Sequence, residues 1–188
     1  MKTLEGRGVT LVELLTVLAI VGVLLAVAAP SLADLLNRRR VEAVASDLSA
    51  DLAYARSEGG LRARAITLRF AADSQTSCYV VHVQGKIGSC NCLNPQGTEC
   101  PGSYSNQLPL KVTRVNASHG VTLVPASGSS TITFVTPHAA LANETGASIT
   151  IIGNRGYKLE ARVSGLGRAL VCDPDGSFGG GYKRCPSE

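Results

Sequence analysis

The chain has 188 residues, of which 45% are hydrophobic, 17% are charged and only 4% are aromatic. The length leaves room for one modest core, and the sequence contains no sign of an internal repeat or a second folded domain. The scarcity of aromatic residues argues against a base-stacking platform, and the net charge of +4 is a weak global field.

The N-terminal thirty residues predict a membrane-spanning helix. A basic leader at residues 1–8 precedes Val9 and the apolar run Leu14–Ala29, in which Thr16 is the one polar side chain. As a helix, residues 9–29 would measure roughly 32 Å, which matches a hydrocarbon core of about 30 Å. Glu13 lies inside this stretch, where an ionisable group is costly, and we therefore expect it to be functional.

The leader permits two kinds of processing. Ala26, Val27 and Ala28 resemble the small-residue site of a secretory signal, whose cleavage would remove the helix. A cut between Gly8 and Val9 would instead leave the helix attached to the mature protein. Positive charge before the span predicts a cytoplasmic N-terminus and an outward, periplasmic remainder.

Residues 30–59 predict an amphipathic continuation of the same helix. Pro30 should kink or interrupt it, because proline lacks an N–H and clashes with the preceding turn. Apolar residues then recur at a spacing of three and four along one face, at Val41, Val44, Ala45, Leu48, Leu52 and Ala55. Gly59 and Gly60 predict the stop, so we expect one helix from Val9 to Glu58.

Residues 60–188 predict a β-rich head in which short runs alternate with Gly- and Ser-rich turns. Packed against the helix, they would form a single α+β domain. The expected strands are Ala65–Phe70, Cys78–Val83, Leu110–Arg114, Val121–Val124, Ser130–Val135, Ser148–Ile152, Lys158–Val163 and Leu170–Cys172.

All six cysteines follow the apolar segment, and an even count in an exported domain favours disulfides. Cys172 and Cys185 bracket a glycine-rich tail, and a bridge between them would hold it in place. We expect two local bridges among Cys78, Cys90, Cys92 and Cys100. A metal site at Cys90 and Cys92 with His82 is the alternative, although the region offers no paired C-x-x-C, and we predict no metal.

Basic side chains gather near the first and last strands of the head, where they form either a solvated surface or a phosphate-binding one. The residues are Arg62, Arg64, Arg69, Arg155, Lys158, Arg162, Arg168, Lys183 and Arg184. The three histidines, His82, His119 and His138, belong to no nucleophile or metal pattern. We therefore predict neither an enzyme nor a cofactor.

The N-terminal motif resembles the class III leader of type IV pilins and pseudopilins. Gly8, Thr10, Leu11 and Glu13 match the family pattern, and Val9 replaces its usual Phe. The resemblance implies cleavage by prepilin peptidase between Gly8 and Val9 and methylation of Val9. It also implies that Glu13 pairs with the N-terminal amine of a neighbouring subunit during assembly, whereas a carboxylate reaching the headgroups without a partner is the simpler reading.

The segment from Arg40 to Glu58 resembles the FimT/FimU/GspH branch of that family, although an ordinary amphipathic helix would also fit. The resemblance implies a type IV pilin-like fold and a minor pilin, a structural subunit of a priming or tip complex whose partners are other pilins. It places the chain in the bacterial inner membrane and then in a pilus. A minor pseudopilin of type II secretion and an anchored periplasmic domain that never polymerises are the alternatives.

Some FimT-like pilins bind double-stranded DNA through a Gly-Arg-x-Arg motif near the C-terminus. Gly167 and Arg168 match its beginning, whereas Leu170 replaces the second arginine. The resemblance makes a DNA-binding surface of Gly167, Arg168, Arg162, Lys183 and Arg184 a further hypothesis for this chain.

Overall fold

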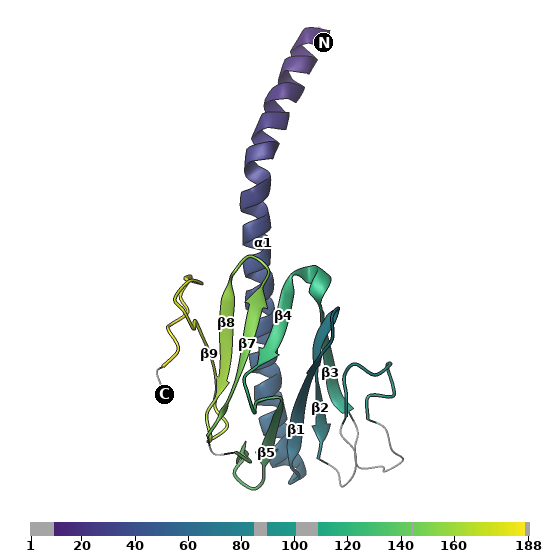
Figure 1. Ribbon diagram of the computed structural model, residues 1–188, viewed down its shortest axis with the longest axis vertical. Helices are drawn as coiled ribbons and strands as arrows, with labels where there is room; N and C mark the ends of the chain where they lie inside the picture. The colour runs from purple at the N-terminus through teal and green to yellow at the C-terminus, as the bar shows by residue number, and fades with distance from the viewer. Residues whose placement is uncertain (1–9, 85–89, 101–108, 144, 187–188) are drawn as a thin grey trace, which may run out of the picture. The chain divides into compact units, whose positions relative to one another are not determined.

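A computed structural model describes residues 10–84, 90–100, 109–143 and 145–186, with only the backbone at residues 27–30. The chain divides into two compact units, Met1–Leu36 and Asn37–Glu188, and each is described by itself. The first unit contributes the N-terminal half of helix α1, Leu11–Arg62, and the second holds the rest of the helix and all of the strands (Figure 1).

Helix α1 continues through Pro30, so proline does not interrupt the helix at this position. Proline removes one intrahelical hydrogen bond, and this loss bends a helix more readily than it ends one. The segments Leu11–Ala26 and Ser31–Arg62 are bent relative to each other, as the kink prediction requires.

The predicted stop at Gly59 and Gly60 is wrong, because α1 continues to Arg62. An ion pair between Glu58 and Arg62 spans the two glycines along the helix. The chain leaves the helix at Ala63, whose φ of +48° gives the left-handed conformation typical of a helix C-terminus.

The head contains two antiparallel sheets. The five-stranded sheet has the order β3-β2-β1-β5-β6, and the four-stranded sheet has the order β4-β7-β8-β9. In chain order the elements are β1 Ile66–Ala72, β2 Thr76–Val83, β3 Pro109–Asn116, the short 3-10 helix η1 Ala117–His119, β4 Val121–Pro125, β5 Thr131–Val135, β6 Ala140–Leu141, β7 Ala147–Gly153, β8 Lys158–Val163 and β9 Ala169–Cys172.

One hydrophobic core joins the head's part of α1 to both sheets. The predicted apolar stripe of the helix is buried, with Val41, Ala45, Leu48, Leu52 and Ala55 each at most 1% exposed. Figure 1 shows this part of the helix running behind the strands of both sheets. The strands supply the other side of the core with residues such as Ile66, Phe134, Ile149, Ile151 and Leu159.

Strand β2 is buried on both faces, because a second, smaller cluster covers the face that points away from the helix. Tyr79, Val81 and Val83 belong to the main core, whereas Cys78 and Val80 pack against Cys90 and Cys92. The disulfides Cys78–Cys92 and Cys90–Cys100 hold the covering loop. Both local bridges are therefore present as predicted.

A buried polar cluster links α1 to β2 and β3. Asp51 is 3% exposed, and its carboxylate accepts hydrogen bonds from the Tyr79 hydroxyl at 2.7 Å and from the Thr113 hydroxyl at 3.3 Å. Lys111 forms an ion pair with the same carboxylate. Since a buried charge is tolerated only with partners, this cluster ties one helix position to two neighbouring strands.

Candidate assembly site

The first turn of α1 places Glu13 through a helix cap at Thr10. The Thr10 hydroxyl accepts a hydrogen bond from the Glu13 N–H at 3.2 Å, and the Thr10 carbonyl accepts one from the Leu14 N–H at 3.1 Å. Thr10 and Glu13 thus stand three residues apart at an N-cap and at the third helical position. This spacing gives Thr10 a structural role that the motif comparison alone does not reveal.

Glu13 is exposed in the first turn of the helix, and the Thr16 hydroxyl donates to its carbonyl oxygen at 2.9 Å. A carboxylate near a helix N-terminus is stabilised by the unpaired backbone N–H groups and the helix dipole. This environment suits an anion at the start of the helix. Gly8 and Val9, the predicted cleavage and methylation residues, lie outside the described residues.

The apolar side chains of the N-terminal unit are uncovered. Between Leu11 and Leu36 the described large apolar residues are 43–74% exposed, and they surround the helix rather than forming one stripe. A surface of this size on a soluble protein marks an interaction with another protein or with a membrane. The described part of this unit thus presents an apolar surface on all sides of the helix.

The described residues contain no single helix that is long and apolar enough to cross a membrane. Taken together, the bent segments Leu11–Ala26 and Ser31–Arg62 pass that test by length and composition.

The C-terminal tail is organised around the buried carboxylate of Asp173. It accepts backbone hydrogen bonds from Gly176 at 2.8 Å, Phe178 at 2.9 Å and Gly179 at 3.3 Å. Phe178 is 2% exposed and belongs to the main core, and the predicted Cys172–Cys185 disulfide closes the loop. Asp173 was not among the predicted site residues, although an aspartate that precedes a glycine-rich run is a local signal for such a turn.

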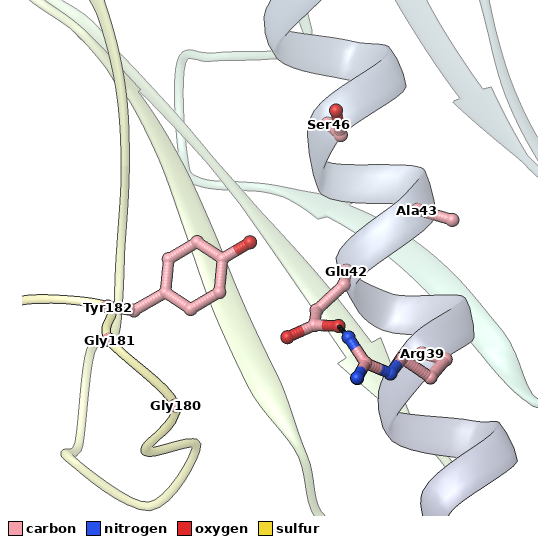
Figure 2. A pocket seen from close by; sticks show the side chains of 7 residues that line it. All are labelled: Arg39, Glu42, Ala43, Ser46, Gly180, Gly181 and Tyr182. Carbon is pink, nitrogen blue, oxygen red and sulfur yellow. Dashed lines mark hydrogen bonds and ion pairs between the residues drawn. The ribbon is translucent and has the colours of Figure 1, made fainter.

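A groove of about 550 Å³ lies between the tail and the exposed side of α1. Figure 2 shows the Tyr182 ring facing Glu42 across it, with the Arg39–Glu42 ion pair on the helix side. Gly180 and Gly181 form the opposite wall. Each of these glycines has a positive φ, at +69° and +96°, which a residue with a side chain rarely adopts.

The proposed DNA-binding residues fall into two separate roles. Gly167 is buried with a φ of +74°, and a Cβ there would lie 2.5 Å from the Ala139 carbonyl oxygen, so the glycine is needed by the fold. Arg168 is exposed and lines a groove of about 850 Å³ together with Arg162 and Leu170.

The structure brings only two of the four basic candidates to that groove. Arg162 and Arg168 line it, but Arg162 also bonds to Glu160 at 2.8 Å and to the Pro186 carbonyl. Lys183 and Arg184 are not among its lining residues, and Arg184 donates to the Asp175 carbonyl at 3.0 Å. Arg168 is therefore the basic group in this groove that is most available to a ligand.

The sheets and the helix define the fold class, and comparison with solved structures confirms the type IV pilin-like α+β prediction. Two crystal forms of the Pseudomonas aeruginosa type IV minor pilin FimU match with TM-scores of 0.54 and 0.51, each at 22% identity. The matches cover 75% and 71% of this chain and 97% of each FimU chain.

The sequence model of the family described as type II transport protein GspH matches residues 44–167, and the chain belongs to this family. Its members are structural pilin and pseudopilin subunits rather than enzymes. No curated protein matches the chain.

Proposed function

We propose that this chain is a minor pilin, cleaved between Gly8 and Val9, held in the inner membrane by α1 and then assembled into a type IV pilus. The observation that carries the proposal is the contrast within α1. The part in the head is covered by strands of the same unit, whereas the described large apolar side chains from Leu11 to Leu36 are 43–74% exposed.

Such a helix suits two successive environments. In a membrane its side chains contact lipid, and in a filament they contact the same apolar surface of neighbouring helices, so transfer between the two costs little. Glu13 is the exception, because its carboxylate gains most from a nearby amine in a water-poor setting. A methylated N-terminus at Val9 of a neighbouring subunit would supply that amine.

Removing the carboxylate tests the assembly role. In the producing cell, Glu13→Ala should reduce the amount of this subunit in sheared filaments, while the amount in membranes stays at the wild-type level. Thr16→Ala is a matched control, because it removes a polar group one turn away and keeps the charge. If Glu13→Ala enters filaments normally, this carboxylate has no role in assembly. If the wild-type protein is itself absent from sheared filaments, an anchored periplasmic domain that never polymerises explains the chain better.

A minor pseudopilin of type II secretion is the alternative within the same class. The membership in the GspH family favours it as much as the likeness to FimU favours the pilus. Deleting the gene separates the two. Loss of surface pili with normal secretion supports the pilus, and loss of secretion with normal pili supports the pseudopilus.

Double-stranded DNA is a second candidate ligand, favoured by the shared groove of Arg162 and Arg168. Binding through these residues should weaken steeply as salt rises and should fall on Arg168→Ala. Fluorescence anisotropy with the purified head measures both effects. Absence of salt-sensitive binding at low ionic strength would remove this candidate without touching the pilin proposal.

A further inference from the structure

Three consecutive arginines lie at the N-terminal end of the head unit. Arg38, Arg39 and Arg40, here called the arginine collar, begin two residues after Leu36, the last exposed leucine of the apolar helix. The collar lies wholly within the head unit, and all three side chains are exposed or half-buried.

The contacts of the collar leave most of its positive charge available. The Arg38 guanidinium lies 5.1 Å from the centre of the Phe178 ring, and Arg40 donates to the His119 carbonyl at 3.0 Å. Neither contact is with an anion, and among the described residues neither arginine forms an ion pair. Arg39 pairs with Glu42 at 2.9 Å, but its side chain stays 71% exposed.

The surrounding chain holds this end of the head in one arrangement. The Gly120 carbonyl accepts from the Asn37 side chain and from the Asn154 N–H, both at 2.9 Å, which joins α1 to two turns of the sheets. On the tail side, a Cβ at Gly180 would come within 2.0 Å of the Arg38 guanidinium. The buried side-chain amide of Asn37 therefore fixes the helix beside the collar, and the absence of a side chain at Gly180 leaves space for the Arg38 guanidinium.

The length of the apolar segment indicates which layer of a membrane the collar would reach. From Leu11 to Leu36 a helix measures about 39 Å, which exceeds the hydrocarbon core of about 30 Å and approaches the full bilayer of about 40–45 Å. Residues that follow Leu36 would therefore stand at the level of the phosphates. Helical side chains lean toward the N-terminus, so the arginines would lean back toward the membrane.

We propose that the arginine collar binds the phosphate groups of anionic phospholipids in the leaflet next to the head. This inference rests on the proposed membrane stage and adds the lipid class and the residues that select it. Arginine suits this ligand because its planar fork donates two hydrogen bonds to one phosphate. The contact would hold the base of the head to the membrane until the subunit is extracted.

Lipid selection by the full-length protein tests the proposal. The protein is purified from membranes and placed in nanodiscs of mixed phosphatidylcholine and phosphatidylglycerol. After the protein is released from the nanodiscs, native mass spectrometry identifies and counts the lipids that stay bound to it. The wild type should retain phosphatidylglycerol several-fold above its share of the disc. Arg38→Gln with Arg40→Gln should lower this several-fold enrichment to nearly the share of phosphatidylglycerol in the disc, since an arginine near an anionic surface contributes about 1 kcal/mol to the attraction.

A matched pair of variants separates the collar from charge in general. Arg62→Gln with Arg64→Gln removes the same charge at the far end of the helix, where Arg62 lies about 33 Å from Arg40, and should leave the enrichment unchanged. Arg38→Lys with Arg40→Lys keeps the charge but loses the bidentate hydrogen bonds, so it should lower the enrichment by less than the glutamine pair does. If the glutamine pair does not fold, as judged by thermal unfolding, the exposed Arg39→Gln serves in its place and should lower the enrichment alone.

Three outcomes would overturn the inference. Equal enrichment in the wild type and the collar variants would show that the collar does not select lipid. Loss of enrichment on adding soluble glycerol phosphate would show a free phosphate site instead. A wild-type protein that does not enter nanodiscs at all would contradict the membrane stage of the proposed function, which distinguishes the two failures.

Discussion

Gly167 and Arg168 are sequence neighbours, yet the structure gives them different consequences on substitution. Gly167 needs its positive φ and lies against the Ala139 carbonyl and the Phe134 ring, whereas Arg168 projects from an exposed turn. A Gly-Arg pair at this place therefore does not by itself indicate a ligand, because half of it serves the fold.

Gly167→Ala should lower the free energy of unfolding by about 2–4 kcal/mol, since it combines a strained φ with a carbonyl clash. Gly156→Ala is the matched control, because Gly156 has a φ of +86° and nothing within 4 Å of the added Cβ, so only the strain of about 1 kcal/mol remains. Chemical denaturation measures both values. Equal losses for the two variants would contradict the packing argument.

Tyr79→Phe should lower the free energy of unfolding by about 1.5–3 kcal/mol, because it removes a buried hydrogen bond to the Asp51 carboxylate and keeps the ring. Burial, with a smaller contribution from Asp51, raises the pKa of Tyr79 above its usual range, so the hydroxyl stays a neutral donor. The exposed Tyr54→Phe provides the comparison and should change stability by less than about 0.5 kcal/mol. A small loss in both variants would mean that the cluster adds little.

His82 predicts a pH dependence of stability. It is 5% exposed, and burial, with a smaller contribution from nearby Arg69, lowers its pKa. A base with a lowered folded pKa contributes stability that is complete above the unfolded pKa of about 6.5 and is lost as the pH falls through the folded pKa. The free energy of unfolding should therefore fall between about pH 7 and pH 5, by at most about 1.4 kcal/mol per pH unit from this group.

Replacing His82 with Gln should flatten that dependence, whereas the exposed His119→Gln should leave it as in the wild type. Carboxylates with lowered pKa values, such as Glu99 beside Arg114, act at lower pH and do not obscure this window. Denaturation curves recorded across the window for the three proteins provide the measurement. An unchanged slope in His82→Gln would exclude His82 as its source.

At the scale of elements, the periodicity of apolar residues predicts the positions of the strands and the buried face of the helix, because both follow from local sequence. All eight expected strands are present within three residues of their predicted ends, and the helical stripe is the buried one. Strand β6 was missed because two residues, Ala140 and Leu141, carry no alternation of their own. The helix end was misplaced because the Glu58–Arg62 pair and Ala63 outweigh the glycines.

The disulfide Cys172–Cys185 closes the tail loop. Replacing Cys172 and Cys185 together with Ser should lower the free energy of unfolding by about 3 kcal/mol, the value expected for a loop of this length. Hydrogen exchange should increase in the tail, residues 173–186, before it increases in β1 and β2. If the tail keeps its protection, Asp173 and Phe178 hold it without the disulfide.

At the scale of the whole molecule, the N-terminal motif indicated a pilin before any fold was known, because Gly8, Thr10 and Glu13 form a local pattern. The pairing of Asp173 with three tail amides and the packing of Arg38 on Phe178 were not predictable in the same way. Both contacts join groups that come close to each other only after the hydrophobic core has formed. Local motifs thus identify the class, and tertiary contacts determine the surfaces.

A role in filament assembly requires a mature subunit that keeps its apolar helix. Mass spectrometry of the protein purified from the producing cell's membranes tests this most directly. The account predicts a chain that begins at Val9, carries one methyl group on its N-terminus and has all six cysteines oxidised. A chain that begins at Met1, or beyond Ala28, would contradict it, because the first lacks the new amine and the second lacks the helix.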